Sequence, residues 1–160
     1  MSCNKDRPHI LVLPEDDANR QLARGFHEHV DFRPRQMQVL PVAGGWNAVL
    51  ERFNPDHVKD MDRFPKHFMV LLIDFDAKEE RLKIAQAAIP PHLADRVFVL
   101  GAWSNPEALR ADLGRQYEDI GAALAADCRD GTDATWGHSL LQHNASELKR
   151  LREQVRSVLF

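Results

Sequence analysis

Four short apolar runs alternate with segments of helical spacing along the chain. The runs occupy residues 9–13, 37–42, 68–73 and 96–100. The third contains Met-Val-Leu-Leu-Ile, which is apolar at every position, as is typical of a strand covered on both faces. Strands of this kind, each followed by a helix, predict an α/β fold: a three-layer Rossmann-like sandwich with a mostly parallel central sheet of about four strands.

The segments after these runs predict the helices. An apolar stripe that repeats every four residues indicates a helix over residues 17–29, capped by Asp16 or Asp17. The stripe consists of Leu22, Phe26 and Val30. Residues 54–65 are polar and contain two prolines, so we expect mainly a loop there. Further helices are expected at residues 48–53, 79–89, 106–114 and 117–126, and from residue 144 onward.

The C-terminal third is therefore predicted to be helical. Its last helix opens with Asn144 and, three residues later, Glu147, a variant of the capping box. A chain of 160 residues with 44% hydrophobic content fits one domain. We expect a core at residues 1–103 and a helical extension of the same domain at residues 104–160.

Composition narrows the setting and the partners. The net charge of -3 gives no general attraction to nucleic acid, so such binding would need a local patch or a partner subunit, and a protein partner or homo-oligomer stays open. The apolar run at residues 10–13 is too short for a signal peptide or a membrane span. Cys3 and Cys128 offer no disulfide framework. We expect a soluble, cytoplasmic protein without a membrane partner.

Acidic side chains follow two of the predicted strands. Glu15, Asp16 and Asp17 follow the first, and Asp74 and Asp76 follow the third. Because the carboxyl ends of parallel strands meet at one edge of a sheet, these side chains should lie close together. An isolated acid at a strand end is usually a cap or a solvated turn residue, but two matched strand ends favour a site.

Converging carboxylates repel one another and need a neutralising partner. A hard divalent cation, Mg²⁺ or Mn²⁺, suits oxygen ligands of this kind. Asp74 and Asp76 are two residues apart, so in an extended chain both point to the same side while Phe75 packs the opposite way. The expected metal ligands are Glu15, Asp74 and Asp76, with Asp16 or Asp17 assisting.

A glutamate after the first strand and an Asp-x-Asp after a later one resemble the Toprim domain of topoisomerases, bacterial primases and overcoming-lysogenization-defect nucleases. The resemblance covers roughly residues 8–101. It implies that Glu15, Asp74 and Asp76 are catalytic, that the acids hold magnesium against phosphates, and that the glutamate acts as general acid or base on phosphodiester bonds. The family often has glycine directly after the glutamate and shortly after the Asp-x-Asp; here Asp16 and Ala77 follow.

This resemblance favours nuclease-like hydrolysis by a metal-activated water. Strand passage would require a nucleophilic tyrosine in a separate domain, and the only tyrosine, Tyr117, lies in a predicted helix. Four further residues are candidates for binding the substrate, although solvation or helix capping explains them equally well. They are Lys78, Arg81, Ser104 and Asn105.

A second resemblance, to response-regulator receiver domains, stays open. There Asp16 and Asp17 would bind magnesium, Asp74 would accept a phosphoryl group, and Ser104 would be the switch hydroxyl. Receivers require a lysine at the end of a fifth strand, and the chain after Leu100 shows neither. A third alternative is a non-catalytic α/β interaction module.

Residues 135–144 combine aromatic, imidazole and amide groups. His138 and His143 are five residues apart, which disfavours a zinc pair on one helix face. Trp136 is interpreted as a core anchor for the last helices. A further hypothesis is that one of the two histidines folds back to the acidic strand ends as a proton shuttle or phosphate contact.

Overall fold

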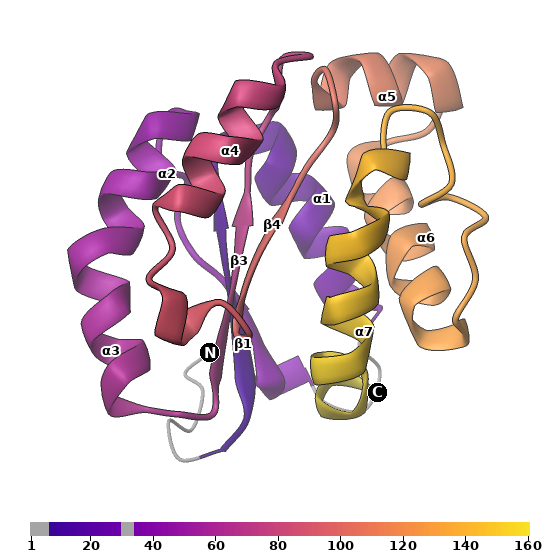
Figure 1. The fold of residues 1–160 in the computed structure, drawn as a ribbon. Coiled ribbons are helices and arrows are strands. Elements are labelled where there is room, and N and C mark those ends of the chain that lie inside the picture. Colours follow the sequence, from indigo (N-terminus) through magenta and orange to yellow (C-terminus); the bar gives the residue numbers. More distant parts are fainter. Residues whose placement is uncertain (1–6, 30–33) are drawn as a thin grey trace.

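A parallel sheet forms the centre of the protein in the computed structural model, which describes residues 7–29 and 34–160 (Figure 1). Its strands are β1 (His9–Pro14), β2 (Met37–Val39), β3 (His67–Leu72) and β4 (Val97–Leu100). They are ordered β2-β1-β3-β4, and every neighbouring pair is parallel. The predicted four-stranded α/β architecture is confirmed.

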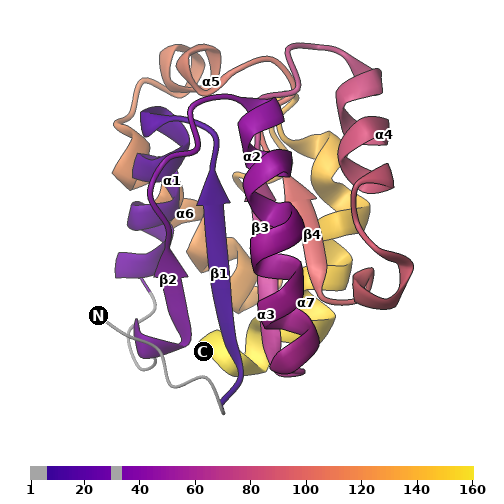
Figure 2. The ribbon, with the colours of Figure 1, turned by 90° about the vertical axis from the view of Figure 1, so that its left-hand side faces the viewer.

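Helices cover both faces of this sheet. One face carries α1 (Asp17–Glu28), α5 (Pro106–Leu113), α6 (Tyr117–Asp130) and α7 (Ala145–Leu159). The other carries α2 (Trp46–Arg52), α3 (Val58–Arg63) and α4 (Glu79–Ala87), and Figure 2 shows α2 and α3 in front of the sheet. Each face thus has its own apolar core. No helix in the described ranges is both long and apolar enough to cross a bilayer.

The prediction of a loop at residues 54–65 is wrong. A π-helical turn (Phe53–His57) joins α2 to α3, and only Asn54 leaves helical geometry, with φ -115° and ψ 123°. That single extended residue accommodates the following proline, after which the helix resumes. Burial of Phe53 and Met61 in the core stabilises this polar segment as a helix, which local sequence signals did not reveal. Val30, expected in the stripe of α1, lies outside the described residues.

Side chains of the C-terminal segment cover the outer edge of β4. The Val99 N–H donates to Glu147 Oε2 at 2.9 Å, and the Gly101 N–H donates to Asn144 Oδ1 at 3.2 Å. The expected capping box is therefore wrong, because Asn144 makes no side-chain cap bond to α7. Both residues instead satisfy backbone groups of an edge strand that would otherwise be open to pairing.

Candidate functional site

The acidic side chains lie at the point where the helices that follow two neighbouring strands cover opposite faces of the sheet. β1 and β3 are neighbours in the sheet, but α1, which follows β1, and α4, which follows β3, lie on opposite faces. In open α/β sheets, ligands bind outside the carboxyl ends of the strands at such a switch point. Glu15 and Asp74 follow these two strands directly or by one residue, so the fold brings both to this place.

Glu15 and Asp74 are in direct contact. The Asp74 backbone N–H donates to Glu15 Oε2 at 2.6 Å, and the Glu15 N–H donates to Leu72 O at 2.9 Å. The Glu15–Leu72 bond continues the β1–β3 ladder beyond β1, and the Asp74–Glu15 bond holds the glutamate carboxylate beside the aspartate backbone. The strand-end argument therefore correctly placed this pair.

Asn19 links Asp74 to one further carboxylate, that of Asp16, and sequence reasoning missed Asn19. Its Nδ2 donates to Asp16 Oδ1 at 2.9 Å and to Asp74 Oδ1 at 2.8 Å. Asp16 also caps α1, because its Oδ1 accepts the Asn19 backbone N–H at 3.0 Å. A signal was present: Asn19 lies three residues before Leu22, so it continues the buried stripe of α1 with a polar side chain.

Burial and neighbouring negative charges raise the pKa values of both Glu15 and Asp74. Burial raises the pKa of Asp74 to about 7, with further increases from the charges of Glu15, Asp16 and Glu107, while the Asn19 amide opposes the shift. Burial also raises the pKa of Glu15, against hydrogen bonds from the Asp74 and Trp46 backbones. Glu107, in the first turn of α5, was not among the predicted residues, although it follows a strand at the same edge.

Asp76 does not join this pair. It adopts φ 51° and Ala77 adopts φ 54°, so the chain turns sharply where the sequence interpretation assumed an extended strand. The Asp76 carboxylate is 57% exposed and lies 3.7 Å from Lys78 Nζ and 3.6 Å from an Arg81 guanidinium nitrogen. The expectation that Asp74 and Asp76 point to the same side is therefore wrong for this conformation. Phe75 is fully buried, as expected.

The turn at Asp76 is held by backbone bonds and is strained. Asp76 N–H donates to Ser104 O at 3.0 Å, and Ala77 N–H donates to Trp103 O at 2.7 Å. Left-handed geometry at a residue other than glycine costs about 1 kcal/mol or more and concentrates at functional sites.

Arg81 ties the turn to the acidic pair. One guanidinium nitrogen donates to Asp74 O at 3.0 Å, and its carbon lies 5.0 Å from the centre of the Trp46 ring. Arg81 is therefore positioned at the edge by three neighbours: a carbonyl, a carboxylate and an aromatic face. Lys78 is exposed and contacts Asp76 alone among the acids of the edge.

The remaining predicted residues have distinct local roles. Asn105 caps α5, because its Oδ1 accepts the Ala108 N–H at 2.8 Å. Ser104 Oγ is buried without a hydrogen-bond partner among the described residues. Asp17 lies on the exposed side of α1, where it pairs with Arg20 and accepts a bond from Gln21 at 2.6 Å. The Asp17 carboxylate therefore interacts with side chains of its own helix.

The histidines separate in space. His138 pairs with Asp112 of α5 at 2.5 Å. The His143 ring lies 5.0 Å from the Phe75 ring and 5.3 Å from the Trp103 ring, directly behind the Asp74–Asp76 segment, and burial lowers its pKa. His143 therefore folds back towards the carboxyl ends of the strands, but it contacts aromatic rings there and not the acids. Trp136 is a core residue, as expected, and its Nε1 donates to Leu124 O at 3.0 Å.

We call Glu15, Asp16, Asn19 and Asp74 the acidic edge. In the described part of the chain, no three carboxylate, imidazole or thiol side chains converge as a ready metal site. Two carboxylates are in place, and a third, Asp76, is held by cations of its own loop. Comparison with protein-family models, with curated proteins and with solved structures found no match to this chain.

Proposed function

We propose that the protein binds Mg²⁺ or Mn²⁺ at Glu15 and Asp74 and acts on phosphodiester bonds of nucleic acid, as the Toprim resemblance implies. The observation that carries the proposal is that the Glu15 carboxylate accepts the backbone N–H of Asp74, so that two half-buried carboxyl groups whose pKa values are both raised lie at one sheet edge. A cation reverses that unfavourable charge, and carboxylate oxygens are the ligands that Mg²⁺ and Mn²⁺ prefer. The donor set therefore fits such a metal.

Asp16 and Asp76 complete the proposed ligand set. Asp16 is already joined to Asp74 through Asn19. Asp76 would have to leave Lys78 and Arg81, and the strain at its left-handed backbone favours such a rearrangement. Release of Asp76 would free both cations to bind a substrate phosphate, with Arg81 still positioned by Trp46.

Glu15 is the proton-transfer residue in this proposal. Burial raises the pKa of Glu15 towards the range in which a carboxyl group works as a general acid or base near neutral pH, and a bound cation would lower that pKa again. A metal at this edge would supply charge neutralisation and an activated water for hydrolysis. Ser104 and Asn105 remain rim candidates, although capping accounts for the Asn105 side chain.

Manganese titration calorimetry on three variants tests the proposal. Asp74→Asn and Asp76→Asn should each weaken manganese binding tenfold or more, since each removes a ligand. Asp17→Asn is the matched control: it removes one negative charge close to Glu15 in sequence, but Asp17 is exposed and paired with Arg20. Unchanged manganese affinity in Asp76→Asn contradicts the Toprim-like assignment.

A receiver-like phosphoacceptor is the second candidate. The strand order β2-β1-β3-β4 and the Asn19 link between Asp16 and Asp74 favour it. Against it, Glu147 and Asn144 of the C-terminal segment cover the β4 edge where a fifth strand would pair. If Asp17→Asn weakens manganese binding, Asp76→Asn does not, and acetyl phosphate modifies Asp74, the receiver assignment is correct. Absence of divalent binding at millimolar concentration would instead favour an interaction module.

A further inference from the structure

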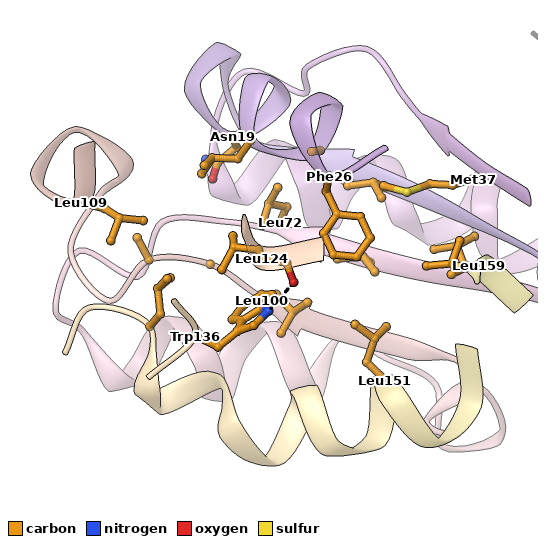
Figure 3. Close-up of a pocket in the computed structure, with 18 residues that line it drawn as sticks. Asn19, Phe26, Met37, Leu72, Leu100, Leu109, Leu124, Trp136, Leu151 and Leu159 are labelled. Carbon is orange, nitrogen blue, oxygen red and sulfur yellow. Dashed lines mark hydrogen bonds between the residues drawn. The ribbon is translucent and has the colours of Figure 1, made fainter. Parts of the chain in front are cut away.

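A cavity lies inside the core between the sheet and helices α1, α6 and α7 (Figure 3). Its volume is about 80 Å³. Leucine, isoleucine, valine, methionine, phenylalanine, alanine and glycine residues line it, with two exceptions, Asn19 and Trp136. The Trp136 Nε1–H is already donated to Leu124 O at 3.0 Å, so it offers nothing to an occupant.

The cavity is large enough for a small organic molecule. About 10–15 Å³ of such volume holds one water, and an apolar cavity of about 150 Å³ engineered in another protein stays dry and binds benzene or xenon. A cavity of about 80 Å³ therefore admits a compact ring or a short branched chain, especially where flexible side chains such as Met37 and Leu124 line it.

One polar side chain of the lining, that of Asn19, has an acceptor atom without a partner among the described residues. Asn19 is fully buried, and its Nδ2 donates to Asp16 and Asp74. Asp16 Oδ1 also accepts the Asn19 backbone N–H at 3.0 Å, so it acts as an acceptor towards the amide, which fixes the orientation of the amide and leaves Asn19 Oδ1 as an acceptor. That oxygen has no hydrogen-bond partner among the described residues. A buried acceptor left in this state is unfavourable, so a donor at this position would be stabilising.

We propose that the cavity binds a compact, uncharged apolar molecule that carries one hydrogen-bond donor, and that the donor is bound by Asn19 Oδ1. Water fits less well, because a buried water needs at least two polar partners and the lining offers one free acceptor. The occupant would contact the residue that joins Asp16 to Asp74, so this apolar site and the acidic edge share Asn19.

Pyrrole and furan test the two parts of the proposal, namely binding in the apolar cavity and a hydrogen bond to Asn19 Oδ1. The two rings match in size, and only pyrrole has an N–H donor. We expect pyrrole to raise the midpoint of thermal unfolding and to shift the methyl resonances of Leu72, Leu100 and Leu124 in NMR titrations. Pyrrole should bind about fivefold tighter than furan, the effect of one net hydrogen bond. Absence of binding by both rings, or equal binding by both, overturns the proposal.

Cavity-filling variants locate the binding. Val70→Leu adds a methylene to a lining side chain and should abolish binding of both rings, while Val99→Leu adds the same group in the other core and should leave binding unchanged. Asn19→Leu should remove the preference for pyrrole over furan. Pyrrole shifts that persist in Val70→Leu and are lost in Val99→Leu would place the ligand elsewhere and refute the assignment. Near-UV circular dichroism verifies that each variant is folded.

Discussion

Replacing Asp74 with asparagine should stabilise the protein at pH 8 and change its stability little at pH 4. The pKa of Asp74 is raised from 3.8 to about 7 in the folded protein. Between these two values the folded state retains a proton that the unfolded chain has lost. Stability therefore falls as pH rises through this window, and the loss is complete above pH 7. Asparagine is neutral throughout and avoids this loss.

The size of the effect follows from the shift. Moving a carboxyl pKa from 3.8 to about 7 corresponds to at most about 4 kcal/mol. Asp74 is only partly buried, so solvent screening reduces the value, and we expect about 2 kcal/mol at pH 8. The asparagine Oδ1 can still accept the Asn19 Nδ2–H, so the variant preserves the hydrogen bond at this position. For a chain of this length, the corresponding rise in unfolding midpoint is about 4–8 °C.

Urea unfolding of wild type and Asp74→Asn at several pH values between 4 and 8 measures this difference. Taking the difference between the two proteins cancels the titration of all other groups that behave alike in both. Asp17→Asn serves as a control, because the pKa of exposed Asp17 is lowered by its hydrogen bonds with Arg20 and Gln21. Removing that carboxylate should not stabilise the protein at pH 8.

Two outcomes would refute the reasoning. A difference between wild type and Asp74→Asn that stays constant from pH 4 to pH 8 would show that Asp74 does not titrate in this window. A wild type that gains stability relative to the variant as pH rises would show that the Asp74 carboxylate is stabilised by its surroundings. Added manganese should reverse the sign at pH 8, because a ligand bound only by the folded wild type increases its stability.

Two further predictions concern the packing that supports the site. Glu147→Ala should lower the free energy of unfolding in urea by about 1–3 kcal/mol, because it leaves the Val99 N–H unsatisfied. The control Glu153→Ala, on the exposed side of α7, should lower it by less than about 0.5 kcal/mol. Equal losses would contradict the role of Glu147 in covering the edge of β4. Gly121→Ala should lower the free energy of unfolding by about 3 kcal/mol or more, since a Cβ there would lie 2.1 Å from Leu22 O. The control Gly131→Ala has only the penalty of a left-handed backbone, φ 71°, and should cost about 1 kcal/mol. A smaller cost for Gly121→Ala would show that α1 and α6 separate easily.

The sequence by itself determined the strands and the meeting of two acids. An unbroken apolar run bounded by turn residues is a local property, so the β3 segment was recognisable without its neighbours. Because all four strands are parallel, the residues after β1 and β3 had to reach the same edge of the sheet. That geometric rule was sufficient to pair Glu15 with Asp74.

Sequence patterns were less informative where a residue's role depends on a distant partner. Asn144 and Glu147 match a capping box locally, yet they bind the backbone of Gly101, directly after β4, and of Val99 in β4, more than 40 residues away. The same applies to residues 54–65, where burial of Met61 outweighs two prolines and a polar composition. Apart from proline, local propensities differ by less than the free energy of burying one large apolar side chain, and the extended backbone at Asn54 accommodates Pro55, so tertiary contacts decided both segments.

Only the tertiary structure decided the composition of the acidic edge. The spacing of two residues suggested that Asp74 and Asp76 act together. Hydrogen bonds from Asp76 and Ala77 to the loop after β4 instead turn the chain, and the Asp76 carboxylate pairs with Lys78 and Arg81. Asn19 became a member because α1 packs its buried face beside β3. The spacing of residues along a strand sets the side to which their side chains point only while the backbone stays extended. Here the extended backbone ends at hydrogen bonds to the loop after β4, which is distant in sequence.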